Sequence, residues 1–271
     1  MKLFTNSISL SVTIAVLFLA SCQKSVEVYP EDGEIDNVPK RKANRICQIT
    51  SIHFNDPFNS YNGRFYYNKV GNPDSVIFDV VGTGFPNLYF KYDNTGRLTE
   101  TKLVYSDGTY ELWHRYGYVG NVITTDTVYA FGEANTEPEP ANFMSKRINF
   151  IEYDNYGRIF RETEDYIVPD LETVVRTYEY DNGGNLQVPG TTIIYDGNVN
   201  LHSLHETWQF LARDYSDNNP LQAGSYNEYA LPMLFDLPES ESSSFRFLGG
   251  SRSLNRSQIE YDCKKAKDIM F

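Results

Sequence analysis

A short motif that begins with tyrosine and ends with glycine constrains the fold of this chain more than any other feature. The residue after each tyrosine is Asp or Asn, whose side chain can accept hydrogen bonds from backbone amides two residues on. Glycine stands four positions after the tyrosine, where a turn requires a positive φ that a Cβ would oppose. The motif therefore predicts a tight turn at each of its four full copies, which begin at Tyr67, Tyr92, Tyr153 and Tyr180.

Apolar and polar residues alternate on both sides of these turns, as in a β-strand with one buried face. "NLYFKY" precedes the copy at Tyr92, "INFIEY" precedes the copy at Tyr153, and a second apolar run follows each. A turn that ends in a left-handed glycine commonly closes a hairpin with a bulge. We therefore expect a mainly β protein, an antiparallel meander of hairpins that forms one extended twisted sheet. Shorter relatives of the motif occur at residues 61–64, 118–121 and 195–198.

Calcium binding is the functional alternative for this motif, because Asp, Asn and Gly also build calcium loops. One carboxylate per turn is far fewer than the about six to eight oxygen ligands that calcium takes. Turn formation is therefore the better interpretation.

Residues 92–98, Tyr-Asp-Asn-Thr-Gly-Arg-Leu, resemble the YD repeat of Rhs-type proteins, which form arrays of β-hairpins. The resemblance covers scattered pieces of the chain, and the full copies begin 25, 61 and 27 residues apart, unlike a tandem array. It implies hairpins, but no large enclosing shell and no toxin cargo.

Two segments interrupt the strand pattern. The polar stretch of residues 131–146 predicts an insertion that could serve binding. Further on, Asn200 can cap a helix, and we expect one short helix over residues 201–213 that covers part of the sheet. The apolar residues at helical spacing are Leu201, Leu204, Trp208, Leu211 and Tyr215.

The first residues of the chain indicate export. Lys2 is followed by an apolar stretch that is short for a membrane span and typical of a secretory signal peptide. It ends in Leu19-Ala20-Ser21-Cys22, which resembles the lipobox of bacterial lipoproteins. The resemblance implies cleavage before Cys22 and attachment of lipid to that cysteine. The alternative is a plain signal peptide with an incidental cysteine.

These features divide the chain into residues 1–21 as signal peptide, residues 22–45 as a lipid-anchored flexible tether, and residues 46–271 as a single mainly β domain. Gln23 stands where an Asp would, by analogy with lipoproteins, favour the inner membrane, so we expect the outer membrane, with surface display as an option. The lipobox, the hairpin motif and residues 213–232 together resemble Bacteroidota-type surface lipoproteins. This resemblance implies no particular activity.

Charge and cysteine content add two expectations. Acidic residues outnumber basic ones by 36 to 24, so the chain repels phosphate polymers and we expect no nucleic-acid partner. Cys47 and Cys263 lie near the two ends of the predicted domain. They either form a disulfide that joins the first strand to the last or stay as two buried thiols, and the sequence leaves both options open.

No sequence motif of a catalytic class occurs: Gly-x-Ser-x-Gly, His-Glu-x-x-His and the phosphate-binding loop are missing. His202 and His205 are three residues apart, but zinc usually takes four ligands. We therefore expect no metal, no cofactor and no enzymatic activity, with a hydrolase as a remote alternative.

Aromatic residues, 15% of the chain, are the strongest functional hint. Their faces can stack on sugar rings, although aromatic pairs also simply stabilise sheets. The candidates for ligand stacking are Trp113, Trp208, Tyr116 and Tyr118. We expect a non-enzymatic binding module of the cell envelope for an extracellular polymer such as a glycan. The alternative is a protein-interaction or structural scaffold at the outer membrane that uses a sheet edge or residues 131–146.

Overall fold

A computed structural model describes residues 46–55, 60–82, 84–138, 142–187, 193–220, 223–236, 254 and 256–264. The predicted signal peptide of residues 1–21, the lipid-attachment residue Cys22 and the tether of residues 22–45 lie outside these described residues. None of the helices in the described ranges has the length and apolar character needed to cross a membrane.

The described residues are mainly β. Their strands are β1 (Cys47–Asn55), β2 (Ser60–Tyr67), β3 (Pro73–Phe78), β4 (Asn87–Tyr92), β5 (Leu98–Val104), β6 (Thr109–Val119), β7 (Val122–Glu133), β8 (Phe143–Tyr153), β9 (Ile159–Val168), β10 (Val174–Thr177), β11 (Glu179–Tyr180), β12 (Leu186–Gln187), β13 (Ser225–Tyr226), β14 (Pro232–Asp236) and β15 (Arg256–Cys263).

Thirteen of these strands form one open antiparallel sheet in the order β10-β9-β8-β7-β6-β5-β4-β3-β2-β1-β15-β14-β13, and β11 pairs with β12 apart from it. Strands β1 to β10 are neighbours in space as in sequence, because each connects to the next as a hairpin. The predicted antiparallel meander is therefore confirmed. The predicted insertion at residues 131–146 is shorter than expected, since β7 runs to Glu133 and β8 begins at Phe143.

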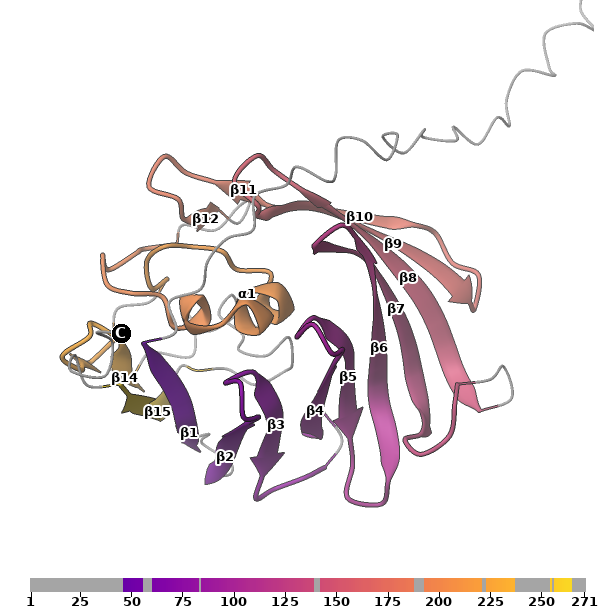
Figure 1. The fold of residues 1–271 in the computed structure, drawn as a ribbon, viewed down its shortest axis with the longest axis horizontal. Helices are drawn as coiled ribbons and strands as arrows, with labels where there is room; N and C mark the ends of the chain where they lie inside the picture. Colours follow the sequence, from indigo (N-terminus) through magenta and orange to yellow (C-terminus); the bar gives the residue numbers. More distant parts are fainter. Residues whose placement is uncertain are drawn as a thin grey trace, which may run out of the picture.

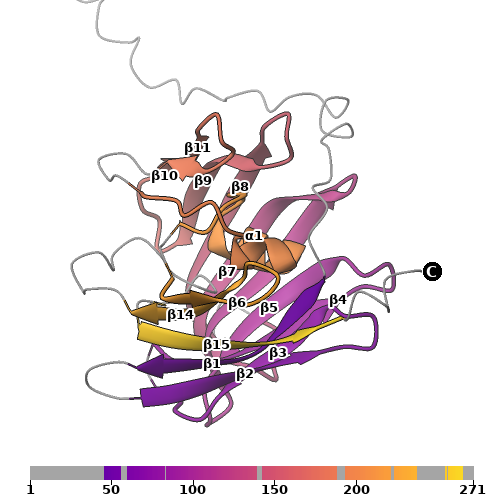
Figure 2. The ribbon, with the colours of Figure 1, turned by 90° about the vertical axis from the view of Figure 1, so that its left-hand side faces the viewer.

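The sheet curves around a short helix, α1 (Glu206–Ala212), which lies on its concave side (Figure 1). After β10 the chain leaves the sheet, passes through α1 on that side, and returns to place β15 beside β1 and β14 beside β15 (Figure 2). Antiparallel pairing sets Cys47 opposite Cys263, and the two form a disulfide between residues 216 positions apart. The disulfide therefore joins the first strand of the described chain to the last.

The predicted helix over residues 201–213 is present but divided. Leu201–Leu204 form a 3₁₀ turn that Asn200 caps, since its Oδ1 accepts a 2.9 Å hydrogen bond from the backbone N–H of His202. His205 is extended and interrupts the helix. Its ring Nδ1 accepts a hydrogen bond from the backbone N–H of Thr207, so the same residue that ends the 3₁₀ turn caps α1.

The apolar core lies between α1 and the concave face. Trp208 is 1% exposed and meets the rings of Phe65 and Phe90 edge-on, at centroid distances of 5.7 and 5.6 Å. Alternate residues of β1, β2 and β4 point at this side of the sheet, as the two-residue period of a strand requires. Full burial of one such side chain contributes about 1.5–3 kcal/mol, so this core holds α1 against the sheet.

The four full motif copies form the same turn. Oδ1 of Asp93 accepts hydrogen bonds from the backbone N–H groups of Thr95 and Arg97, at 2.9 and 3.0 Å. Asn68, Asp154 and Asp181 accept from the matching positions of their own turns. The four glycines have φ between 73° and 84°, a region that a Cβ disfavours.

A β-bulge beside these turns decides which side chains of the return strand face inward. The register between β8 and β9 shifts between Glu152 and Tyr153. As a result Ile159 and Glu162 are both buried on the concave side, although residues three apart in a regular strand face opposite sides. The motif tyrosines also pack against the concave core, so the motif both closes hairpins and places a ring beside α1.

The shorter motif relatives differ from one another. Residues 118–121 close the β6–β7 hairpin, and residues 195–198 form a turn outside the strands. The predicted turn at residues 61–64 is wrong, because these residues lie inside β2, where Gly63 lets the ring of Phe78 approach. A further copy begins at Tyr226: Asn227 makes the same turn bonds, and Ala230 takes the glycine position with φ 59°.

Candidate functional site

Three of the four aromatics predicted to stack on a ligand offer no open ring face. Trp208 lies in the core, and Tyr116 is 8% exposed with its ring against Phe210. Trp113 lies on the convex face, 2% exposed, with the Lys102 ammonium 3.5 Å and the Arg115 guanidinium 4.5 Å from its ring centroid. Other side chains of the protein cover these three rings, and their stacking on a ligand stays a prediction.

Tyr118, the fourth candidate, lines an open pocket of about 110 Å³ between α1 and the turns at one end of the sheet. Two motif tyrosines, Tyr92 and Tyr153, line the same pocket, and Phe210 of α1 contributes to its wall. We call this the turn pocket. Its tyrosines come from three hairpins because the same motif places a ring on the concave side in each.

Hydrogen bonds hold Tyr92 and Tyr118 of the turn pocket in place. The Tyr92 hydroxyl lies 3.1 Å from Oγ1 of Thr207 on α1, and the Tyr118 hydroxyl donates to the carbonyl of Leu98 at 2.9 Å. Burial raises the pKa of Tyr118 well above its ordinary value, so its hydroxyl is protonated at neutral pH. The rings therefore form a preorganised neutral wall.

Polar side chains also line the turn pocket. Arg97 lies with its guanidinium 4.8 Å from the Tyr118 ring centroid, and its Nε donates to Asp93 at 2.8 Å. Asn121, in the β6–β7 turn, is exposed, and Glu206 begins α1. The pocket thus combines an apolar wall with a few hydrogen-bonding groups, the usual composition of a small-ligand site.

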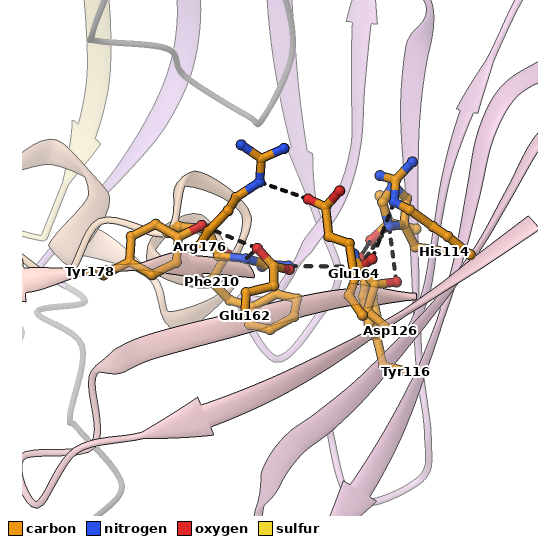
Figure 3. Close-up of polar contacts among 12 residues, drawn as sticks. His114, Tyr116, Asp126, Glu162, Glu164, Arg176, Tyr178 and Phe210 are labelled. Carbon is orange, nitrogen blue, oxygen red and sulfur yellow. Dashed lines mark hydrogen bonds and ion pairs between the residues drawn. The ribbon is translucent and has the colours of Figure 1, made fainter. Parts of the chain in front are cut away.

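A buried charge cluster lies beyond Phe210 on the concave side of β6, β7, β9 and β10 (Figure 3). Its acids are Asp126, Glu162 and Glu164, which are 1%, 4% and 7% exposed. Arg213, which follows α1, places Nη2 2.8 Å from Glu162 and 3.7 Å from Asp126. The other basic members are His114, whose Nδ1 is 3.0 Å from Asp126, and Arg176, whose Nε is 2.8 Å from Glu164.

Opposite charges favour the ionised forms of Arg213 and Glu164 in this cluster. Burial alone would lower the pKa of Arg213, but the charge and hydrogen bonds of Glu162 raise it above its ordinary value. Burial would likewise raise the pKa of Glu164, but the hydrogen bond from Arg176 holds it below its ordinary value. Each buried charge is thereby compensated, as stability requires.

The charge cluster holds the end of α1 against the sheet. Arg213 has φ 54°, and its backbone N–H bonds to carbonyls of the last helical turn. Its guanidinium also lies 4.3 Å from the ring centroid of Phe210. Because Phe210 lines the turn pocket, the cluster fixes one wall of that pocket from behind.

His202 and His205 do not form a site together. His202 is 1% exposed, with Nδ1 2.9 Å from Asp214, while His205 caps α1 and places Nε2 3.3 Å from Asn72. The sequence suggested a partly exposed pair, and the helix break at His205 instead buries both. No group of three metal-ligating side chains occurs within the described part of the chain.

Sequence reasoning missed the polar residues of the turn pocket. Arg97 stands in the turn motif that begins at Tyr92, and Asn121 stands in the shorter relative at residues 118–121. The motif shows only these local positions, and the pairing of β5 with β6 brings the two residues to one pocket. No protein-family model matches the chain, and no curated protein is significantly similar to it.

Proposed function

We propose that this protein is a non-enzymatic carbohydrate-binding module of the cell envelope, anchored to the outer membrane by lipid on Cys22. The turn pocket is its binding site and accepts one sugar ring of an extracellular glycan. The lipobox-like residues 19–22 support the anchor, and the aromatic wall of the pocket supports the ligand class.

The observation that carries this proposal is the meeting of Tyr92, Tyr118 and Tyr153 at one open pocket with Arg97 and Asn121. One water occupies about 10–15 Å³ of such space, so 110 Å³ suits a single six-membered ring. A sugar ring has apolar C–H faces and a rim of hydroxyl groups. Tyrosine rings match the faces, and amide and guanidinium groups match the hydroxyls.

The balance of charges at the turn pocket favours an uncharged sugar. Arg97 brings one positive charge to the pocket, but Asp93 binds it and Glu206 adds a further negative charge. The whole chain has a formal net charge of −12, which opposes the approach of polyanions. The expected ligand is therefore a neutral glycan.

The test is a glycan-array screen with the full-length protein, followed by affinity measurement for the best ligand. Arg97→Ala should weaken binding at least tenfold, since a hydrogen bond to a charged group is worth about 1.5–3 kcal/mol. Arg158→Ala is the matched control. Arg158 holds the same motif position, its Nε lies the same 2.8 Å from Asp154, and it does not line the pocket. Equal losses in both variants, or no binding across the array, would refute the proposal.

Interaction with another protein is a second candidate function, favoured by the exposed β10 edge. All four residues of β10 are exposed, and within the described ranges the strand that pairs with β10 is β9. Unpaired edges offer backbone groups to an incoming strand. Exposed apolar side chains gather nearby: Ile167, Val168, Leu171, Val174 and Val175. Crosslinking in intact envelopes tests this role, and a Val175→Lys variant that keeps every crosslink would contradict it.

The hydrolase alternative has less support. Glycoside hydrolysis needs two carboxyl groups that face a substrate cleft. The buried carboxylates Glu162 and Glu164 are instead held by Arg213 and Arg176.

A further inference from the structure

The convex face of the sheet carries a row of residues that register places side by side. Tyr66 on β2 pairs with Ser75 on β3, and Ser75 pairs with Tyr89 on β4. Directly paired residues lie on the same face, so both tyrosines face outward across the small serine. Tyr66 is 47% and Tyr89 42% exposed, so these rings, unlike that of Trp113, are open to solvent.

The distance between the two rings follows from sheet geometry. Neighbouring strands lie about 4.8 Å apart, so Tyr66 and Tyr89 are about 10 Å apart across the sheet. That distance is close to the length of a disaccharide unit in an extended β-linked chain. Two rings at this spacing can stack on alternate residues of such a chain, and Ser75, which is 7% exposed, lies at the base of the surface between them.

A shallow groove of about 620 Å³ borders Tyr66 and extends across β1 and β15, and its first polar row begins at Arg64, two residues along β2 from Tyr66. Its lining is polar: Arg64 pairs with Ser51, which pairs with Glu260 on the next strand. The Ser51 hydroxyl donates to Glu260 at 2.7 Å. A second row, Asn62, His53 and Gln258, runs beside the first. Donors and acceptors therefore form two parallel rows across the strands.

Hydrogen bonds fix the side chains of this groove in advance. Nδ1 of His53 lies 2.7 Å from Oδ1 of Asn62, and Nδ2 of Asn62 donates to Asp79 at 2.7 Å. Preorganised polar groups lose less entropy when a ligand binds. The lining includes one arginine, Arg64, and one glutamate, Glu260, a balance that suits an uncharged ligand.

We propose that Tyr89, Tyr66 and the adjoining groove form a second binding site, for an extended, uncharged, β-linked polysaccharide segment of about four residues. The estimate of length follows from the four strand spacings between β4 and β15. The ligand class rests on the proposed function. The site itself does not, because it lies on the opposite face of the sheet from the turn pocket.

The test uses the full-length protein and three neutral probes, cellohexaose, xylohexaose and chitohexaose, with the matching di- and tetrasaccharides. Affinity for the best probe should rise from the disaccharide to the tetrasaccharide and then level off. Tyr66→Ala and Tyr89→Ala should each lower that affinity roughly three- to tenfold, as loss of one stacked ring predicts. Tyr66→Phe, which keeps the aromatic ring, should retain the wild-type affinity for the probe.

Tyr156→Ala is the matched control, since Tyr156 is 71% exposed but lies on the β8–β9 turn, away from the row. Affinity that ignores probe length, or that survives both alanine substitutions, would overturn the inference. Arg97→Ala separates the two sites. Hexasaccharide binding that Tyr66→Ala weakens and Arg97→Ala does not supports this second site, even if the turn pocket binds nothing. Binding that Arg97→Ala weakens and Tyr66→Ala does not rejects the second site and leaves the proposal for the turn pocket standing.

Discussion

Nη2 of Arg213 lies 2.8 Å from Oε1 of Glu162 and joins the end of α1 to β9. Both side chains are largely buried, at 16% and 6% exposed. The pair links the helix to the curved wall of the sheet, and it stabilises the wall of the turn pocket formed by Phe210.

Loss of one partner of this pair should therefore destabilise the fold strongly. We expect Glu162→Ala to lower the free energy of unfolding by about 3–5 kcal/mol, because Arg213 would stay buried without its main counter-charge. Urea denaturation measures the change. Arg161→Ala on the same strand is the control: its contact with Glu152 is 3.5 Å long and more exposed, so about 1 kcal/mol or less should be lost. Similar losses in both variants would contradict this role.

Stability should fall on acidification. Burial would raise the pKa of Asp214, but hydrogen bonds from His202, Ser216 and Asn200 hold it below its ordinary value. The unfolded chain then binds more protons than the folded one near and below pH 4, so the stabilisation is present above that range and lost as pH falls through the folded pKa.

Urea midpoints measured from pH 6 to pH 2 test this dependence. Asp214→Asn should lower stability at neutral pH and flatten the acid dependence. Asp170→Asn, at an exposed position, should leave the slope unchanged. A wild-type slope in the Asp214→Asn variant would show that another group controls acid unfolding.

Backbone strain at the turns can be isolated from packing. Gly108 has φ 86°, and a Cβ built there meets no atom within 4 Å. Gly108→Ala should thus cost about 1–2 kcal/mol from conformation alone. Gly82 has equally open space and no positive φ, so Gly82→Ala should be neutral or stabilise by up to about 1 kcal/mol. Thermal unfolding compares the two, and changes of the same sign would refute this account of the turns.

The disulfide should contribute a large share of the stability. Replacement of both Cys47 and Cys263 by Ala should lower the free energy of unfolding by about 2–5 kcal/mol, because the link closes a long loop in the unfolded chain. Denaturation of the wild-type protein with and without reductant provides an independent comparison. A denaturation midpoint that stays unchanged after complete reduction would contradict a stabilising role of the disulfide.

Local chemistry predicted the hairpins well. Each turn depends on an Asp or Asn and a glycine only a few residues apart, so Asp93 with Gly96 is enough to identify one. The same turn residues give a wrong prediction where pairing with neighbouring strands determines the backbone conformation. Residues 61–64 carry turn residues but lie inside β2, and the turn at Asn227 does not match the motif because Ala230 replaces glycine.

Long-range packing explains the remaining errors. Alternation shows that a strand has two faces, but not which face the helix will cover. Trp113 and Trp208 are equal candidates for stacking in the sequence, yet cations cover Trp113 on the convex face, while Trp208 of α1 packs against Phe65 and Phe90 of the sheet. Equally, nothing local shows that β15 returns to β1, or that Tyr66 and Tyr89 share a row.

The central claim is that a glycan binds in the turn pocket, and hydrogen–deuterium exchange with the best ligand of the array tests it most directly. Saturating ligand should slow exchange in residues 92–98, 118–123 and 206–210, which line the pocket, while residues 180–187 of the similar β11–β12 turn should not change. Protection confined to other segments, or no protection despite measured binding, would contradict the account.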